Sequence, residues 1–170
     1  MKLSSKTQRI ALCALFTSVS IIFGYIEFLI PFNFGIPGVK LGLANLIVVV
    51  LLYVSDLKTT VITSALRIFI SALLFGSFYS FLYSLIGGIL SLTVMSLIKR
   101  IQGFTPIGVS ISGGVAHNIG QLLVAFLTFG VSEIFFYLPI LLIAGALTGG
   151  LIGVCSLPVI KKLNKIRTLK

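Results

Sequence analysis

Three polar side chains lie close together in an otherwise apolar stretch of the chain. His117, Asn118 and Gln121 fall within residues 108–129, where most neighbours are Val, Leu, Ile, Ala or Gly. On an α-helix, Gln121 lies one turn beyond His117 and Asn118, so the three share one side. An imidazole and two amides can hold a polar ligand through hydrogen bonds, and His117 alone could equally be a packing residue with a hydrogen-bond partner. In a membrane helix this side must face protein or a water-filled cavity.

Cationic residues elsewhere complete a candidate site for an anion. Arg67 lies eight residues into a second apolar stretch, about 12 Å along a helix. Two cations and a histidine against one nearby acid, Glu27, favour an anionic ligand with an apolar part. The predicted substrate-binding residues are Lys40, Asn45, Arg67, Tyr83, His117, Asn118 and Gln121. Arg67 could instead pair with Glu27 or with carbonyl groups and brace the helices, and both roles stay open.

The acidic residues are too few and too scattered for common enzymatic sites. The chain has three, Glu27, Asp56 and Glu133, and no two are close in sequence. This disfavours a Mg²⁺-diphosphate site, which carboxylates normally hold. A single histidine with no cysteine nearby offers few zinc ligands, and no P-loop occurs. We therefore predict no catalytic residue, no metal site and no cofactor, which favours a non-enzymatic role.

The composition assigns the chain to membrane proteins. Of its 170 residues 58% are hydrophobic and 9% are charged, whereas soluble domains carry roughly 25% charged residues. The apolar runs are continuous over spanning length, unlike the alternating strands of a β-barrel. The net charge of +10 comes from basic residues at the ends of these runs. Their position indicates membrane topology and not a nucleic-acid partner.

We predict a single all-α integral membrane domain over residues 1–170, with six transmembrane helices in the lipid bilayer. The predicted spans are residues 10–30, 41–54, 59–75, 78–98, 108–129 and 135–160. An even number of spans places both termini on one side, which then carries the basic residues other than Lys40 and the intramembrane Arg67. By the positive-inside rule both termini are cytoplasmic, and the charge asymmetry supports six spans over five or seven. We expect the protein to lie in the plasma membrane.

Small residues predict two faces for helix contact. The face in the last span consists of Gly145, Gly149 and Gly153, a doubled G-x-x-x-G that lets another backbone approach closely. The face in the first span consists of Ala11, Ala14 and Ser18. If the first span is an outer helix, its face could dock a partner subunit.

Several motifs resemble those of a known family. They are Gly38-x-Lys40-Leu-Gly42-Leu-Ala44-Asn45, Arg67 with Gly76-x-x-Tyr79-Ser80 and Tyr83-Ser84-Leu-x-Gly87, and Gly113-Gly114-x-Ala116-His117-Asn118-x-Gly120-Gln121. They resemble the Gx transporter family, whose members are commonly labelled heptaprenyl diphosphate synthase component I. The resemblance covers nearly the whole chain, and the last motif is the most specific.

The resemblance implies two functions. The family is similar in span number and topology to the substrate-binding S components of energy-coupling factor (ECF) transporters. That likeness implies capture of a small molecule, such as a vitamin, quinone or isoprenoid precursor, with a membrane coupling subunit and two cytoplasmic ATPases as partners. The synthase label implies instead a non-catalytic accessory subunit in menaquinone or isoprenoid synthesis, because the single aspartate, Asp56, cannot form a D-D-x-x-D motif. We expect the first function, with the second as the alternative and a membrane scaffold as the third.

Overall fold

The computed structural model describes residues 6–29 and 42–168, and within these ranges the chain forms helices joined by short turns. The elements are α1 (Lys6–Leu29), α2 (Leu43–Val54), α3 (Leu57–Phe75), α4 (Phe78–Ile98), α5 (Pro106–Phe129), the 3₁₀ helix η1 (Ser132–Tyr137) and α6 (Leu138–Thr168). The all-α prediction is confirmed. Five of the helical segments are long and apolar enough to cross a membrane, and α2 is a shorter apolar helix.

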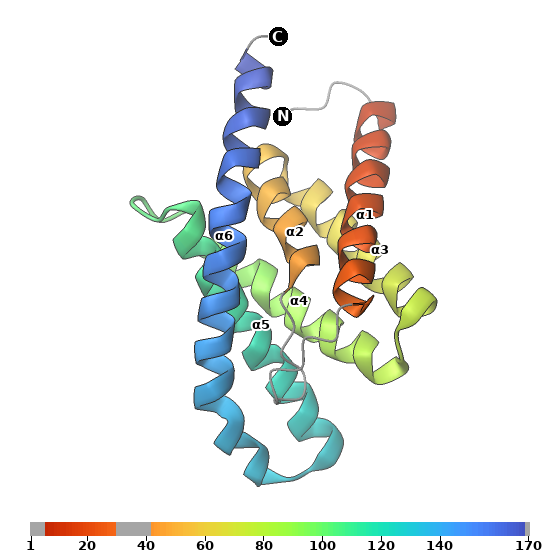
Figure 1. Cartoon of the computed structure of the whole chain (residues 1–170), viewed down its shortest axis with the longest axis vertical. Helices are drawn as coiled ribbons and strands as arrows, with labels where there is room; N and C mark the ends of the chain where they lie inside the picture. The colour runs from red at the N-terminus through yellow and green to blue at the C-terminus, as the bar shows by residue number, and fades with distance from the viewer. Residues whose placement is uncertain (1–5, 30–41, 169–170) are drawn as a thin grey trace.

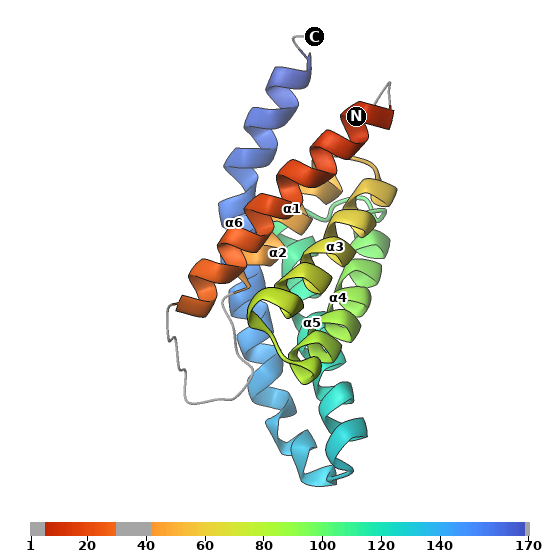
Figure 2. The same ribbon diagram turned by 90° about the vertical axis from the view of Figure 1, so that its right-hand side faces the viewer.

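The helices form a bundle in which the start of α1 and the end of α6 lie on the same side (Figure 1). α5 packs mainly against α6 and α4, while α1 packs against α3 and α2. The 31 residues of α6 measure roughly 46 Å at 1.5 Å per residue, so α6 is longer than a bilayer core and extends past the other helices (Figure 2). The helix continues beyond the predicted limit at residue 160 into the basic tail.

The short helix α2 lies inside the bundle. It has only 12 residues, and consecutive residues from Ile47 to Leu52 are buried, with Val50 and Leu51 fully inaccessible. A helix that is apolar on every side is buried in protein or in lipid, and 12 residues are too few to span a bilayer core alone. Val48, Val49 and Val50 contribute to the main apolar core together with residues of α4, α5 and α6. The length of α2 is therefore explained by its burial among longer helices.

Local signals set the ends of α5. Thr105 precedes the helix and its hydroxyl accepts a hydrogen bond from the Gly108 amide at 3.3 Å. Pro106 occupies the first helical position, where no amide hydrogen is needed. Gly130 ends the helix in the left-handed region at φ 66°, which glycine adopts without steric cost.

The glycines of α6 lie against the backbone of α5. A methyl group placed at Gly149 would be 2.6 Å from the carbonyl oxygen of Ser110, and equivalent groups at Gly145 and Gly153 would be 2.7 Å from backbone atoms of α5. The Ser110 hydroxyl donates a hydrogen bond to the Gly149 carbonyl oxygen at 2.7 Å. Small residues thus bring the two backbones close enough for direct polar contact.

Candidate functional site

Arg67 on α3 reaches α2. Its Nη2 donates a hydrogen bond to Oδ1 of Asn45, with an N···O distance of 2.5 Å. Both side chains are half-buried. A hydrogen bond from a charged donor is stronger than a neutral one, so this contact ties two helices together through two of the residues predicted to bind substrate.

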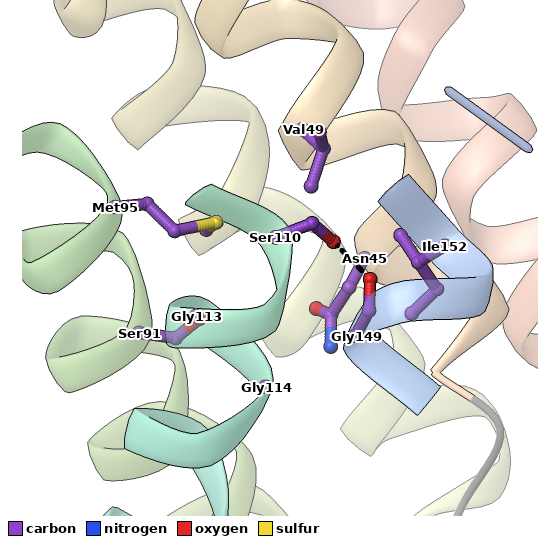
Figure 3. A pocket seen from close by; sticks show the side chains of 9 residues that line it. All are labelled: Asn45, Val49, Ser91, Met95, Ser110, Gly113, Gly114, Gly149 and Ile152. Carbon is purple, nitrogen blue, oxygen red and sulfur yellow. Dashed lines mark hydrogen bonds between the residues drawn. The ribbon is translucent and has the colours of Figure 1, made fainter. Parts of the chain in front are cut away.

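Asn45 also lines a small internal cavity of about 20 Å³ (Figure 3). The other lining residues come from α2, α4, α5 and α6 and are Val49, Ser91, Met95, Ser110, Gly113, Gly114, Gly149 and Ile152. Figure 3 shows the Asn45 amide beside Gly149 and close to Ser110. The volume is sufficient for about one water molecule. The cavity is too small for an organic ligand, and among the described residues of the predicted set only Asn45 lines it.

His117 and Gln121 contact each other one turn apart on α5. Their Nε2 atoms are 3.2 Å apart; the Gln121 amide nitrogen can only donate, so the histidine Nε2 accepts in the tautomer that carries its hydrogen on Nδ1. The histidine ring lies against Gly87 of α4, where a methyl group would be 2.9 Å from its Cε1. Gly87 therefore makes room for the imidazole between α4 and α5.

The remaining predicted residues have separate surroundings. Asn118 donates from Nδ2 to the carbonyl oxygen of Leu141 at 2.7 Å, which joins α5 to α6. Tyr83 is half-buried on α4. Lys40 lies outside the described residues.

Hydrogen bonds among the described residues divide the predicted set into three separate groups. Asn45 bonds to Arg67, His117 to Gln121, and Asn118 to the backbone of α6. Each set can stabilise a helix contact. A shared role in substrate binding remains a prediction.

Glu27 has a role that sequence reasoning missed. Its carboxylate accepts hydrogen bonds from the amides of Gly42, at 2.6 Å, and Leu43, at 3.1 Å. These amides are at the start of α2, where the backbone lacks internal acceptors and the helix dipole favours a negative charge. Gly42 has φ 74°, a conformation suited to glycine. Glu27 is fifteen residues away along the chain, so no local capping motif signals it.

A second group of charged residues lies where α2 ends and α3 begins. The Lys99 ammonium donates a hydrogen bond to the Leu52 carbonyl oxygen and lies 4.9 Å from the centroid of the Tyr53 ring. Burial lowers the pKa of Lys99. The sequence signal is the adjacent basic pair Lys99-Arg100, which membrane topology alone also explains.

Asp56 lies in the same region, between the end of α2 and the start of α3. Its Oδ1 accepts a hydrogen bond from the Thr59 hydroxyl at 2.5 Å, and its Oδ2 lies 3.7 Å from Nη2 of Arg9 on α1. The Thr59 hydrogen bond is the main cause that lowers the pKa of Asp56, and the Arg9 charge acts in the same direction. The contacts of Asp56 therefore join α1 to the start of α3.

The family model described as heptaprenyl diphosphate synthase component I matches residues 16–158. The chain belongs to this family. No curated protein and no solved structure was found to match it. The comparisons therefore give no support to a likeness to ECF S components.

The component I match includes every predicted substrate-binding residue and the glycine face of α6. It begins after Ala11 and Ala14, so two of the three residues in the small face of α1 lie outside it. Within the matched region, the hydrogen bonds of Arg67 and Asn118 join neighbouring helices and so help to fix their packing.

Proposed function

We propose that this chain is a non-catalytic membrane component of a heptaprenyl diphosphate synthase and acts with a separate catalytic chain. The observation that carries this proposal is the family match over residues 16–158. A chain described as component I implies at least one other component. The sequence contains one aspartate, whereas chains that elongate prenyl groups carry aspartate-rich motifs that hold Mg²⁺ and diphosphate. We therefore assign carbon–carbon bond formation to the partner.

A membrane component has a physical purpose in such a synthase. A heptaprenyl chain is a long hydrocarbon, and its transfer from water into the bilayer is favourable. A bundle with five helices of spanning length and apolar composition can hold a catalytic chain at the bilayer surface. The growing product could then enter the membrane without crossing water.

A binding experiment tests this partnership. Liposomes containing the chain and empty liposomes of the same lipids are mixed with the catalytic prenyltransferase from the same source and separated by flotation. We expect the prenyltransferase to float with the loaded liposomes only. Equal flotation with both kinds of liposome would exclude a specific partnership.

A second candidate function is capture of a small anionic molecule for uptake, with an ECF-type coupling subunit and ATPases. The observation that favours it is the exposure of the small face of α1, formed by Ala11, Ala14 and Ser18, on the outside of the bundle. The pair of Arg67 and Asn45 inside the bundle is also compatible with an anion site, because charges within spans are rarely without function. In this function the termini are cytoplasmic. Native mass spectrometry of the detergent-purified protein would then detect a bound small molecule.

A further inference from the structure

We propose that the cavity between the ends of α2 and α4 and the start of α3 binds the phosphate group of an anionic amphiphile. The cavity has a volume of about 170 Å³. Its walls are formed by Leu52, Leu57, Ser96, Lys99 and Arg100. This site is separate from the residues predicted to bind substrate, and the inference does not rest on the proposed synthase function.

The charges of the cavity favour an anion. Lys99 and Arg100 follow one another directly after the end of α4. The Lys99 ammonium has three donors, of which one bonds to the Leu52 carbonyl oxygen. The Arg100 guanidinium can donate two parallel hydrogen bonds to a phosphate group. The acid next to Leu57 in the chain, Asp56, has its carboxylate engaged by Thr59 and Arg9.

The start of α3 adds to this preference. Leu57 is both a wall of the cavity and the first residue of α3. The N-terminal end of a helix carries a partial positive charge, which offsets part of the partial negative charge that the C-terminal ends of α2 and α4 bring to the same cavity. Ser96 donates its hydroxyl hydrogen to the Leu92 carbonyl oxygen at 2.6 Å, which leaves its oxygen able to accept and not to donate. Among the lining residues, the side-chain donors available to a ligand are therefore those of Lys99 and Arg100.

The position and size of the cavity favour a headgroup that belongs to a larger apolar molecule. Sites that enclose a whole drug-sized ligand measure roughly 300–1,000 Å³, so a volume of 170 Å³ holds only a small group. Leu52 and the partly exposed Leu57 give the cavity an apolar wall that can contact the first carbons of a lipid chain. Lys99 follows a helix of spanning length, and basic residues at such ends lie at the level of lipid headgroups.

A fluorescence titration tests the inference. The chain has no tryptophan, so Leu57→Trp gives a single reporter at the rim of the cavity. The full-length variant in a neutral detergent is titrated with inorganic diphosphate, farnesyl diphosphate, phosphatidylglycerol and, as a zwitterionic reference, phosphatidylcholine. We expect saturable responses to farnesyl diphosphate or phosphatidylglycerol at lower concentration than to inorganic diphosphate, and the tighter of the two amphiphiles identifies the source of the phosphate.

Substitutions assign the response to the cavity. Arg100→Gln removes a charge-assisted contact and should weaken binding of the amphiphile about tenfold or more. The matched control is Lys162→Gln, which removes one exposed charge from α6 outside the cavity and should leave binding unchanged. Lys99→Gln should weaken binding and also lower thermal stability, because Lys99 bonds to the end of α2.

Three results would overturn the inference. They are a response to inorganic diphosphate without any response to an amphiphile, equal weakening by Arg100→Gln and Lys162→Gln, and no response to any phosphate probe. The same probes are added during thermal unfolding of the chain without the tryptophan. If the probes shift the unfolding temperature of this chain but not that of Arg100→Gln, the tryptophan did not create the site. If they do not shift the unfolding temperature of this chain, the result counts against the proposed site.

Discussion

Arg67 and Asn45, twenty-two residues apart in sequence, are joined by a 2.5 Å hydrogen bond between α3 and α2. The bond connects a cation inside a helix of spanning length to the central, buried helix of the bundle. If the guanidinium loses its acceptor, the free-energy cost of removing its charge from water remains, but the hydrogen bond that offsets this cost is gone. We therefore expect this pair to contribute to stability whatever its role toward a ligand.

Removal of either partner should destabilise the bundle. Asn45→Leu leaves the Arg67 guanidinium without its acceptor and should cost about 1–3 kcal/mol, or roughly 2–4 °C in unfolding temperature per kcal/mol. Thermal unfolding in detergent measures the loss. The double variant with Arg67→Leu should lose less than the sum of the single variants, because one interaction is removed twice. Simple additivity would show that the two side chains are not coupled.

The contact between α5 and α6 should reject any side chain at Gly149. Gly149→Ala places a methyl group 2.6 Å from the Ser110 carbonyl oxygen and should destabilise the protein by about 1–3 kcal/mol. Gly150→Ala is the matched control, since its methyl group would lie 3.8 Å from the Ile111 side chain, an ordinary contact. This control should be neutral or slightly stabilising, because alanine favours helix more than glycine does. Similar unfolding temperatures for the two variants would contradict the backbone contact.

The contribution of Asp56 should depend on pH. Hydrogen bonding to Thr59 and the charge of Arg9 lower the pKa of Asp56 in the folded protein. A carboxylate with a lowered pKa stabilises the fold fully above its ordinary value of 3.8 and loses this contribution as the pH falls through the folded value. The difference in unfolding temperature between the parent and Asp56→Asn should therefore be present at neutral pH and shrink below about pH 3.8.

Glu133→Gln is the control for the Asp56 experiment, since Glu133 is an exposed acid on η1. It removes one negative charge without breaking a contact to Thr59 or Arg9. A difference for Asp56→Asn that stays constant from neutral pH to well below 3.8 would show that its carboxylate is not the stabilising group.

The small face of α1 can be tested apart from stability. Ala14 is exposed, so Ala14→Leu should leave the unfolding temperature unchanged. If this face docks a coupling subunit, the larger side chain should prevent co-purification of that subunit. Val61→Leu, at an exposed position of α3, is the control and should preserve the complex. Loss of the complex in both variants, or in neither, would remove this face of α1 from consideration as the docking surface.

The helices were predictable because their signals are local. Continuous apolar runs identify the spans, and the four-residue spacing of Gly145, Gly149 and Gly153 indicates a face for close contact. The prolonged end of α6 was not predicted, because the basic tail after residue 160 has the composition of a solvated end. Its helix continues past Pro158 to Thr168.

The partners of the polar residues were not predictable, because they depend on helices distant in sequence. The sequence allows Glu27 as a partner for Arg67. In the structure the Glu27 carboxylate accepts hydrogen bonds from the first amides of α2, and Arg67 donates to Oδ1 of Asn45. Likewise, two adjacent basic residues predict a membrane boundary but not the bond from Lys99 to α2. Only the packing of α2 against its neighbours brings these groups together.

The central claim is that this chain supports a catalytic partner in prenyl elongation. The direct measurement is elongation of an allylic diphosphate with isopentenyl diphosphate by the catalytic prenyltransferase, in liposomes with and without this chain. Ala14→Leu and Gly149→Ala liposomes test a surface change and a packing change in parallel. We expect a faster rate or a longer product only when the chain is present and folded. The same rate and the same product length with empty liposomes would contradict it.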